Sequence, residues 1–446
     1  MKLHSPRTRR QATFRNWSGS VTTTPDAIHY PGSVAALSEL VRDLPAGRSL
    51  RPFGGAHSFT PCAAGDRDMV SLDRLSGIVS VDRGRKRVRF LAGTRLRDVP
   101  RLLAPFGLAL ANQGDIDVQS LAGAISTSTH GTGIEWTGFA GTVTALSLVD
   151  ASGTAREYSL DDNADLLRLV TVSLGALGIV TEVEMQCVDA FDLLAVEGTD
   201  NIDDVLDTWE ERTRSVDHFE AFWFPHTDRA MVKRNTRLAP GAPAPGGEPK
   251  TRTWLTRTLE DEVLGNGVFA ASLLVGRAVP GTVAFLNNVA VGAMGASAYR
   301  SPAHEVFSTP RRVRFHEMEY AVPLADGPAA VREIRAEVER RGWRIPFPLE
   351  LRSTAADDVA LSTSTGRESM YIAVHVPKSA NPAEYFPPLE SILRAAGGRP
   401  HWGKMHTLER EDLAAIYPGF NEFCALREEM DPQRRFGSDY LRRLFG

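Results

Sequence analysis

The sequence predicts an α+β protein, and three observations support this prediction. Short β-rich runs alternate with helical patterns through residues 1–190, and glycines separate them. From about residue 191 the predicted helices become longer and the strands amphipathic. The chain also has 446 residues, more than one ordinary core accommodates, so we expect two or three domains.

The first half contains three stretches whose elements can be assigned. Residues 87–110 (RVRFLAGTRLRDVPRLLAPFGLAL) predict a strand, a turn, a helix and a second apolar run. Residues 144–160 predict two strands around a Ser-Gly turn. Residues 172–188 predict a glycine-containing apolar run that continues as an alternating strand. Mixed α and β structure is therefore expected for this half.

The second half contains two helices and one loop that can be assigned. Residues 201–214 (NIDDVLDTWEERTR) predict a helix, because acidic residues occupy its first turn. A second helix is expected over 326–342, with Asp326 as the N-terminal cap and Gly342 as the stop. Residues 238–250 are nearly all Pro, Gly and Ala, which predicts a loop.

The charge and the cysteine content exclude several classes of protein. The 51 basic and 55 acidic residues give a net charge of −4, which argues against a basic nucleic-acid-binding domain. The three cysteines are far apart and form no CxxC pair, which argues against a disulfide framework and favours a reducing compartment. The sequence has no secretory signal and no apolar run long enough to span a bilayer. We expect a cytoplasmic protein without a transmembrane segment, at most peripheral to a membrane.

The usual nucleotide and metal motifs are absent or misplaced. Residues 265–270 (GNGVFA) fit GxGxxA but follow an acidic helical run instead of a strand, and no GxxxxGK[ST] occurs. NAD and ATP are therefore disfavoured. No His, Cys or carboxylate lies at metal spacing from His130, and Asp115 with Asp117 offers too few ligands, so we expect no metal.

Two glycine-rich stretches are candidate ligand loops. In residues 53–60 (FGGAHSFT), adjacent glycines let the backbone approach a ligand, and successive amides suit phosphate oxygens. A structural turn around a buried histidine explains this stretch equally well. Residues 112–133 (NQGDIDVQSLAGAISTSTHGTG) are too small and polar to build a core, which favours a backbone-lined groove for an extended, phosphate-bearing cofactor.

Polar side chains on two predicted strands and one turn are candidates for chemistry. Glu350 and Arg352 are two residues apart on one strand and share a face, and His375 lies on a second strand. From spacing alone, a solvated salt bridge with a satisfied histidine is the favoured alternative. Lys404, in the turn RPHWGKMH (399–406), suits an anion or substrate clamp or else a surface loop with one buried tryptophan.

These four stretches, in this order, resemble the sugar-1,4-lactone oxidases and dehydrogenases and the related alditol oxidases, which are flavoproteins of the vanillyl-alcohol-oxidase type. The similarity is greatest to L-gulono-1,4-lactone dehydrogenases and D-arabinono-1,4-lactone oxidases of bacteria. It extends almost from end to end, from NWSGS (16–20) through SLGALGIVTEV (173–183), HFEAFWFPHTD (218–228) and RFHEMEYAVP (314–323) to DPQRRFGSDYLRRLFG (431–446).

The resemblance implies FAD as the cofactor, bonded covalently through His57 to its 8α-methyl group. The loop around His57 would lie against the pyrophosphate, although Gly55-Ala56 stands where many relatives have Ser-Gly, so its turn is expected to differ slightly. The implied cofactor-binding residues are Gly54, Gly55, Ala56, His57, Ser58, Ser126, Ser128, Thr129, His130, Gly131, Thr132, Gly133, Ile179 and Val180.

The resemblance also implies the reaction. FAD would oxidise the C2 secondary alcohol of an aldono-1,4-lactone by hydride transfer to flavin N5, giving an ascorbate-type product. The implied catalytic residues are Ser120, Glu350, Arg352, His375 and Lys404, with the base unassigned between Glu350 and Lys404. The electron acceptor would be oxygen or a cytochrome- or quinone-type acceptor. An alditol oxidase acting on a linear polyol and a non-catalytic flavin-binding protein are the alternatives.

The architecture that the resemblance implies has three parts. A PCMH-type FAD-binding domain of two subdomains would cover residues 1–190. An α+β substrate-binding cap with an antiparallel sheet would cover residues 191–410. Residues 411–446 would return to the FAD domain.

Overall fold

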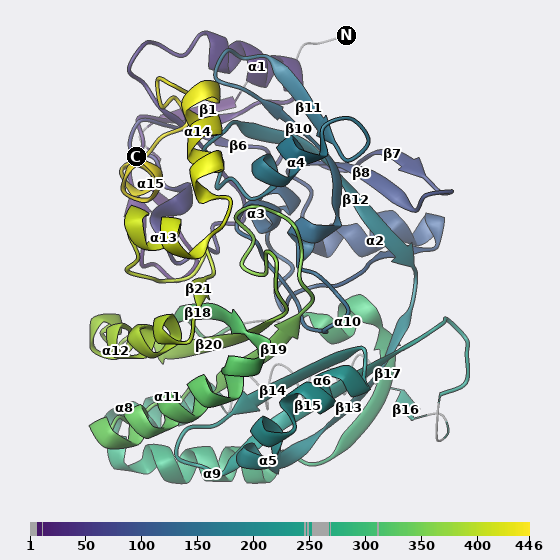
Figure 1. Ribbon diagram of the computed structural model, residues 1–446, viewed down its shortest axis with the longest axis vertical. Coiled ribbons are helices and arrows are strands. Elements are labelled where there is room, and N and C mark those ends of the chain that lie inside the picture. The colour runs from purple at the N-terminus through teal and green to yellow at the C-terminus, as the bar shows by residue number, and fades with distance from the viewer. Residues whose placement is uncertain are drawn as a thin grey trace.

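The computed structural model describes residues 7–10, 12–244, 247, 249–251, 267, 269–309 and 312–446. Three large sheets organise these residues, and Figure 1 shows two of them above the third. Gly265, Asn266 and Val268 of the GNGVFA stretch lie outside the described residues, as does the acidic run before it.

The first sheet contains four strands in the order β1-β4-β6-β5, and a two-stranded hairpin of β2 and β3 lies apart from it. The strands β4, β6 and β5 are parallel, and β1 is antiparallel to β4. The bounds are β1 Arg7–Arg10, β2 Phe14–Arg15, β3 Thr22–Thr23, β4 Ala27–Tyr30, α1 Val34–Arg42, β5 Leu50–Phe53 and β6 Asp68–Ser71. The glycine-rich loop that contains His57 directly follows β5.

The second sheet contains β11-β10-β12-β8-β7, and β9 pairs with the far end of β12. All its pairings are antiparallel. Its elements confirm the predictions for residues 87–110, 144–160 and 172–188. The bounds are β7 Ile78–Asp82, β8 Arg87–Leu91, α2 Val99–Leu103, β9 Leu108–Leu110, α3 Leu121–Ser126, β10 Val143–Val149, β11 Ala155–Ser159, α4 Ala164–Thr171 and β12 Ile179–Asp189.

The third sheet contains nine strands in the order β16-β17-β13-β15-β14-β19-β20-β18-β21. It is antiparallel apart from the β16–β17 pair. The strands are β13 Asp192–Asn201, β14 His218–Trp223, β15 Arg229–Leu238, β16 Lys250–Thr251, β17 Ser297–Pro302, β18 Phe315–Pro323, β19 Leu349–Thr354, β20 Ser369–Pro377 and β21 Arg399–Pro400.

Most helices of this part cover one face of the third sheet, and the other face is turned toward the first two sheets and carries the short helix of residues 303–307 (Figure 1). The helices of this part are α5 Ile202–Asp207, α6 Trp209–Ser215, α8 Phe269–Ala278, α9 Val283–Ala293, α10 Ala303–Phe307, α11 Gly327–Arg341 and α12 Pro382–Ala395. The helix predicted over 201–214 is interrupted at Thr208. Asp326 lies at the start of α11 as predicted, but its side chain makes no capping hydrogen bond, because a 3-10 turn, Leu324–Asp326, precedes it.

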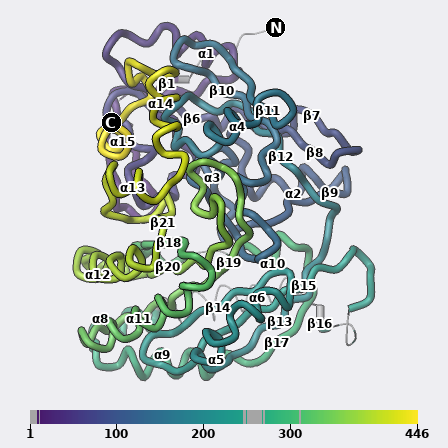
Figure 2. Tube along the Cα trace, viewed as in Figure 1, coloured from purple at the N-terminus to yellow at the C-terminus, as the bar shows by residue number. Residues whose placement is uncertain are grey.

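The C-terminal helices lie beside the first sheet, as Figure 2 shows by their yellow colour next to the purple N-terminal trace. They are α13 Arg410–Ile416, α14 Phe420–Met430 and α15 Asp439–Phe445. The Leu50 amide donates to the Arg435 carbonyl at 2.8 Å, and the Arg51 guanidinium donates to the Phe436 carbonyl at 2.6 Å. The boundaries of the three predicted domains remain predictions. No helix among the described residues is both long and apolar enough to cross a bilayer.

Candidate functional site

Two joined cavities form the candidate site. The first is lined only by the half that contains the first two sheets, and the second lies between that half and the third sheet. The first, which we call the groove, has about 860 Å³ of free space and is lined by residues 51–58, 62–63, 72–73, 92–93, 119–120, 122–123, 126–127, 174–175, 178 and 180. The second, the pocket, has about 800 Å³ and is lined by residues 17, 57–59, 114–116, 119, 127, 129–130, 315, 317, 319, 350, 352, 375, 401 and 403–404. His57, Ser58, Gln119 and Thr127 line both, so His57 lies where the two cavities meet.

The loop after β5 packs too closely against the start of α3 for larger residues. A Cβ atom at Gly54 would overlap the Ser120 Oγ, and one at Gly55 would lie 2.8 Å from the Val118 carbonyl oxygen. Ala56 adopts a left-handed φ of +54°, which costs about 1 kcal/mol for a residue with a side chain. The turn therefore accepts alanine at this position, and the Ala56 carbonyl accepts a hydrogen bond from the Trp17 amide at 2.8 Å.

The groove has the donors and acceptors that an extended phosphate-bearing cofactor needs. The amides of residues 55–58 donate no hydrogen bond to any described residue, so consecutive N–H groups are available to an anion. The buried Gln119 Oε1 also has no partner within the described part of the chain, while its Nε2 donates to Thr129 Oγ1 at 3.2 Å. Buried polar groups are almost always paired. These residues therefore fit FAD.

His57 is a neutral imidazole at the junction of the two cavities. Burial, together with the charges of Lys404 and Arg95, lowers the pKa of His57 to about 4. Its ring stacks on Trp17, with centroids 5.3 Å apart and planes 22° apart. A ring nitrogen that carries no proton is the form in which histidine can form a bond to carbon.

The other predicted cofactor residues divide into two groups. Ser126 and Val180 line the groove, and Thr129 and His130 line the pocket. Ser120, which was predicted to be catalytic, also lines the groove, and it caps α3. The remainder line neither cavity, and these are Ser128, Gly131, Thr132, Gly133 and the core residue Ile179.

Three residues of this second group connect the half of the chain that contains the first two sheets to strands of the third sheet and to the loop after β19. The Gly133 amide donates to the Ser353 carbonyl at 2.7 Å, the Thr363 amide donates to Ser128 Oγ at 3.2 Å, and Thr132 Oγ1 donates to the Phe219 carbonyl. Their assignment to FAD stays a prediction.

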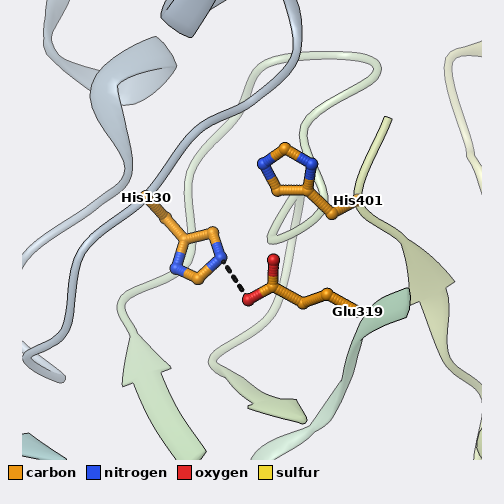
Figure 3. Close-up of side chains that lie close together, drawn as sticks. All are labelled: His130, Glu319 and His401. Atoms are coloured by element: carbon orange, nitrogen blue, oxygen red, sulfur yellow. Dashed lines mark hydrogen bonds and ion pairs between the residues drawn. The ribbon is translucent and has the colours of Figure 1, made fainter. Parts of the chain in front are cut away.

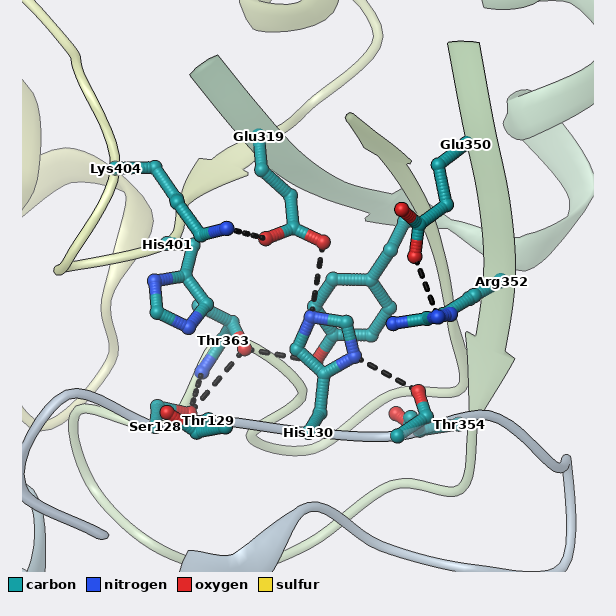
Figure 4. A network of polar contacts seen from close by, with 12 residues as sticks. Ser128, Thr129, His130, Glu319, Glu350, Arg352, Thr354, Thr363, His401 and Lys404 are labelled. Carbon is teal, nitrogen blue, oxygen red and sulfur yellow. Dashed lines mark hydrogen bonds and ion pairs between the residues drawn. The ribbon is translucent and has the colours of Figure 1, made fainter. Parts of the chain in front are cut away.

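Glu350 and Arg352 point into the pocket from β19, as their spacing predicted. They are only 7% and 9% exposed, so the solvated salt bridge that spacing alone favoured is wrong. Arg352 Nη2 lies 2.6 Å from Glu350 Oε1 (Figure 4) and also contacts Asp115. Arg352 Nε lies 2.8 Å from Glu220 Oε2. Burial lowers the pKa of Arg352, but the three carboxylates outweigh it and hold this pKa well above its ordinary value.

Lys404 enters the pocket from the opposite side. Its Nζ contacts Glu317 and lies 3.8 Å from Glu319 Oε2. Burial lowers the pKa of Lys404, but Glu317 and Glu319 outweigh it and raise this pKa above its ordinary value. Trp402 is fully buried in the preceding turn, which is therefore a wall of the pocket and not a surface loop.

His375 shares the sheet face of Glu350 and Arg352. It is the register partner of Glu317 on β18, and its Nε2 lies 3.4 Å from Glu317 Oε1. Its Nδ1 donates to the Pro348 carbonyl at 3.2 Å, which fixes the ring. Burial raises the pKa of Glu317, but Lys404 and His375 outweigh it and lower this pKa to about 2.

Sequence reasoning did not assign several polar residues of the pocket or its rim. These are Trp17, Asp115, Gln119, Glu220, Glu317 and Glu319. Glu317 and Glu319 could have been predicted from the sequence. They alternate with apolar residues along the strand FHEMEYAVP, as Glu350 and Arg352 do along their strand. Asp115 was considered only as a cation ligand.

A cluster of His130, Glu319 and His401 has the donor types of a metal site (Figure 3). Their ligand atoms lie within 4.8 Å of one another, which spacing along the chain could not indicate. His130 Nε2 lies 3.0 Å from Glu319 Oε1, a direct hydrogen bond that already engages both atoms. We therefore interpret the cluster as a hydrogen-bonded pair beside His401.

Known proteins resemble this chain over almost its whole length. Residues 183–444 match the D-arabinono-1,4-lactone oxidase family, and residues 25–159 match an FAD binding domain. The chain is 36% identical to L-gulono-1,4-lactone dehydrogenase of Mycobacterium tuberculosis, over 97% of this chain and 99% of that protein. It is 30% identical to L-gulonolactone oxidase of Mus musculus, over 97% and 98%.

A crystal structure of cholesterol oxidase from Brevibacterium sterolicum shares the fold. Its TM-score is 0.81 at 17% identity, over 99% of this chain and 98% of that chain. The predicted α+β fold, with a PCMH-type FAD-binding part and an antiparallel cap sheet, is thereby confirmed. The resemblance found in the motifs is confirmed as well: the chain belongs to the D-arabinono-1,4-lactone oxidase family of FAD-linked lactone oxidoreductases.

Proposed function

We propose that this protein oxidises the C2 secondary alcohol of an L-gulono- or D-arabinono-1,4-lactone to an ascorbate-type product. One observation carries the proposal: a groove of unpaired amides leads at His57 into a polar pocket with fixed charges. Bound FAD would supply the two-electron oxidation. The pocket residues would bind and orient the lactone.

The groove residues would hold the cofactor. The amides of residues 55–58 would donate to the pyrophosphate, and Val180 would lie toward the adenine half. We propose that neutral His57 forms the covalent bond to FAD. Acid denaturation tests this step, because a yellow pellet with an FAD-sized mass on the His57 peptide supports it, and flavin left in the supernatant contradicts it.

Different residues of the pocket would bind different oxygen atoms of the substrate. Arg352 and Lys404 stay protonated at neutral pH, because their carboxylate neighbours raise both pKa values, so each can donate hydrogen bonds to lactone oxygens. A protonated lysine accepts no proton, so Glu350 is the better candidate of the two for removing the proton of the C2 hydroxyl. His375 would contact the substrate from a neighbouring wall of the pocket. Ser120 lines the groove and not the pocket, so it would lie nearer the cofactor.

Anaerobic flavin bleaching tests the proposed reaction. The FAD-loaded protein is mixed with L-gulono-1,4-lactone, D-arabinono-1,4-lactone or xylitol, and the absorbance of the oxidised flavin is followed. Faster bleaching with a lactone supports the proposal. Faster bleaching with xylitol identifies an alditol oxidase, and no bleaching with any of the three identifies a flavin-binding protein without turnover.

We propose further that the protein is cytoplasmic and docks at a membrane surface through α8 and α9. Residues 269–299 contain one charged residue, Arg277, although 24% of the whole chain is charged. Leu274 and Phe285 in these helices are 69% and 68% exposed. Exposed apolar patches of this kind indicate interaction sites.

Such a location would favour a lipid-soluble quinone over oxygen as the electron acceptor. Co-sedimentation with phosphatidylcholine vesicles tests the docking, which Leu274→Ser/Phe285→Ser should abolish. The reoxidation rate of the reduced flavin in air, with a quinone and with cytochrome c identifies the acceptor.

A further inference from the structure

His130 makes two hydrogen bonds that together require two ring protons or a protonated carboxyl group. Its Nδ1 lies 2.9 Å from the Gly131 carbonyl oxygen, which can only accept, so Nδ1 carries a hydrogen. Its Nε2 lies 3.0 Å from Glu319 Oε1. An ionised carboxylate also only accepts, so a proton must lie between Nε2 and Oε1, on one atom or the other.

The charges around this proton favour its place on His130. Glu317 and Glu319 are two buried carboxylates, and Lys404 is the lysine that contacts both of them. Buried carboxylates need matching positive charge. Lys404 and His375 both face Glu317, whereas Glu319 has Lys404 only at 3.8 Å, so His130 is the group left to supply a close cation to Glu319. Burial raises the pKa of Glu319, but His130 and Lys404 outweigh it and hold this pKa well below its ordinary range.

The remaining groups around His130 suit a cation. Its ring stacks on Tyr371, with centroids 3.5 Å apart and planes 21° apart. The Tyr371 hydroxyl is hydrogen-bonded to Ser364 and Thr363, at 2.6 and 2.7 Å, so the ring presents a fixed face. Aromatic faces attract cations. His401, whose ring centroid is 5.8 Å away, has its pKa lowered to about 3, chiefly by burial, so it is neutral and does not repel a charge on His130.

We propose that His130 is a buried imidazolium and acts as a positioning residue for Lys404. Glu319 connects the two: its Oε1 faces His130, and its Oε2 faces the Lys404 ammonium, as Figure 4 shows. The imidazolium keeps the Glu319 carboxylate ionised and oriented toward Lys404. Glu319 and Glu317 together hold Lys404 in the pocket. His130 thus acts on the substrate only through Glu319 and Lys404, a role that rests on the proposed function.

The protonation state can be measured without turnover. Holoenzyme labelled with ¹⁵N-histidine is studied by NMR at pH 7.5, where the ring-nitrogen shifts separate an imidazolium from a neutral ring. We expect a doubly protonated histidine whose signal is absent in His130→Gln and becomes neutral in Glu319→Gln. His375→Gln is the matched control, because His375 pairs with Glu317 in the same pocket, and it should leave that signal in place.

A kinetic measurement tests the positioning role. In His130→Gln, Glu319 loses its cation, so its carboxyl should protonate at higher pH, and the acid limb of the kcat/KM profile should move up by about one to three pH units. Combining His130→Gln with Glu319→Gln should add little to the loss from Glu319→Gln alone.

Three results would overturn the assignment. One is a histidine spectrum from which His130→Gln removes no imidazolium signal. Another is a protonated carboxyl stretch in the infrared spectrum that disappears in Glu319→Gln, which would place the proton on Glu319. The third is a change in the His130 signal on dialysis against EDTA, which would indicate a bridging metal. If His130→Gln does not fold, the wild-type and Glu319→Gln spectra still decide. Because the spectra need no substrate, failure of the proposed lactone chemistry would leave their result intact.

Discussion

Gly54→Ala should prevent the groove from accepting FAD, because the added Cβ would overlap the Ser120 Oγ. Forcing an extra carbon into a packed site costs about 1–3 kcal/mol, so the loop or the start of α3 must move. Removing the hydroxyl should relieve the overlap, since the next nearest atom is the Ser120 Cβ at 3.2 Å. Ser120→Ala alone loses the α3 cap, in which Oγ accepts from the Gly123 amide at 3.3 Å, at a cost of about 1 kcal/mol.

The double variant Gly54→Ala/Ser120→Ala should therefore bind more FAD than Gly54→Ala alone. Gly55→Ala is the matched control, because its Cβ would meet the Val118 backbone carbonyl at 2.8 Å, which no side-chain change can relieve. The assay is the ratio of flavin to protein absorbance after loading, together with the free energy of unfolding of each apoprotein. Wild-type loading in Gly54→Ala, or equal rescue of both glycine variants by Ser120→Ala, would refute this reasoning.

Three further predictions concern the histidines and the charged pair. His57→Ala should fold and release its flavin on acid precipitation, and a linkage that survives would show that another residue carries the flavin. Glu350→Gln and Arg352→Lys should each lower kcat about 100-fold while the protein stays yellow, so near-normal turnover would remove that residue from the mechanism. Burial lowers the pKa of His218 and His406 to about 3, from an ordinary 6.5. The unfolded chain then binds more protons than the native chain between pH 6.5 and 3, so stability should fall as the pH falls, by up to about 1.4 kcal/mol per pH unit for each histidine. Urea unfolding at pH 7.5, 6 and 5 measures this slope, and His406→Gln should reduce it.

The strand period accounts for much of what the sequence could predict. Two-residue spacing placed Glu350 and Arg352 on one face and His375 on the face of a neighbouring strand, and the structure has them there. The same rule applied to β18 would have found Glu317 and Glu319. The glycine-rich stretches predicted that the backbone packs closely against its neighbours. The structure shows this at Gly54 and Gly55, where a Cβ atom would meet Ser120 and the Val118 carbonyl oxygen.

The remaining contacts depend on strand order and loop position, which local patterns do not encode. Glu319 meets His130 across 189 residues because β18 lies beside β20 and not beside β19. Asp115 reaches Arg352 from a loop of the other half, across 237 residues. The burial of the Glu350–Arg352 pair could likewise not be predicted, because residue spacing shows which face of the sheet a side chain is on but not which elements cover that face.

One wall of the groove is completed only when distant parts of the chain meet. Arg51 lines the groove, and its guanidinium donates to the carbonyls of Leu174, Gly175 and Phe436, the last of them 385 residues further along the chain. During translation the flavin half emerges long before Phe436 does, so its nascent form lacks this support. We therefore expect cofactor capture, and any covalent attachment that follows it, to come after translation, so ribosome-stalled chains ending before residue 431 should be colourless.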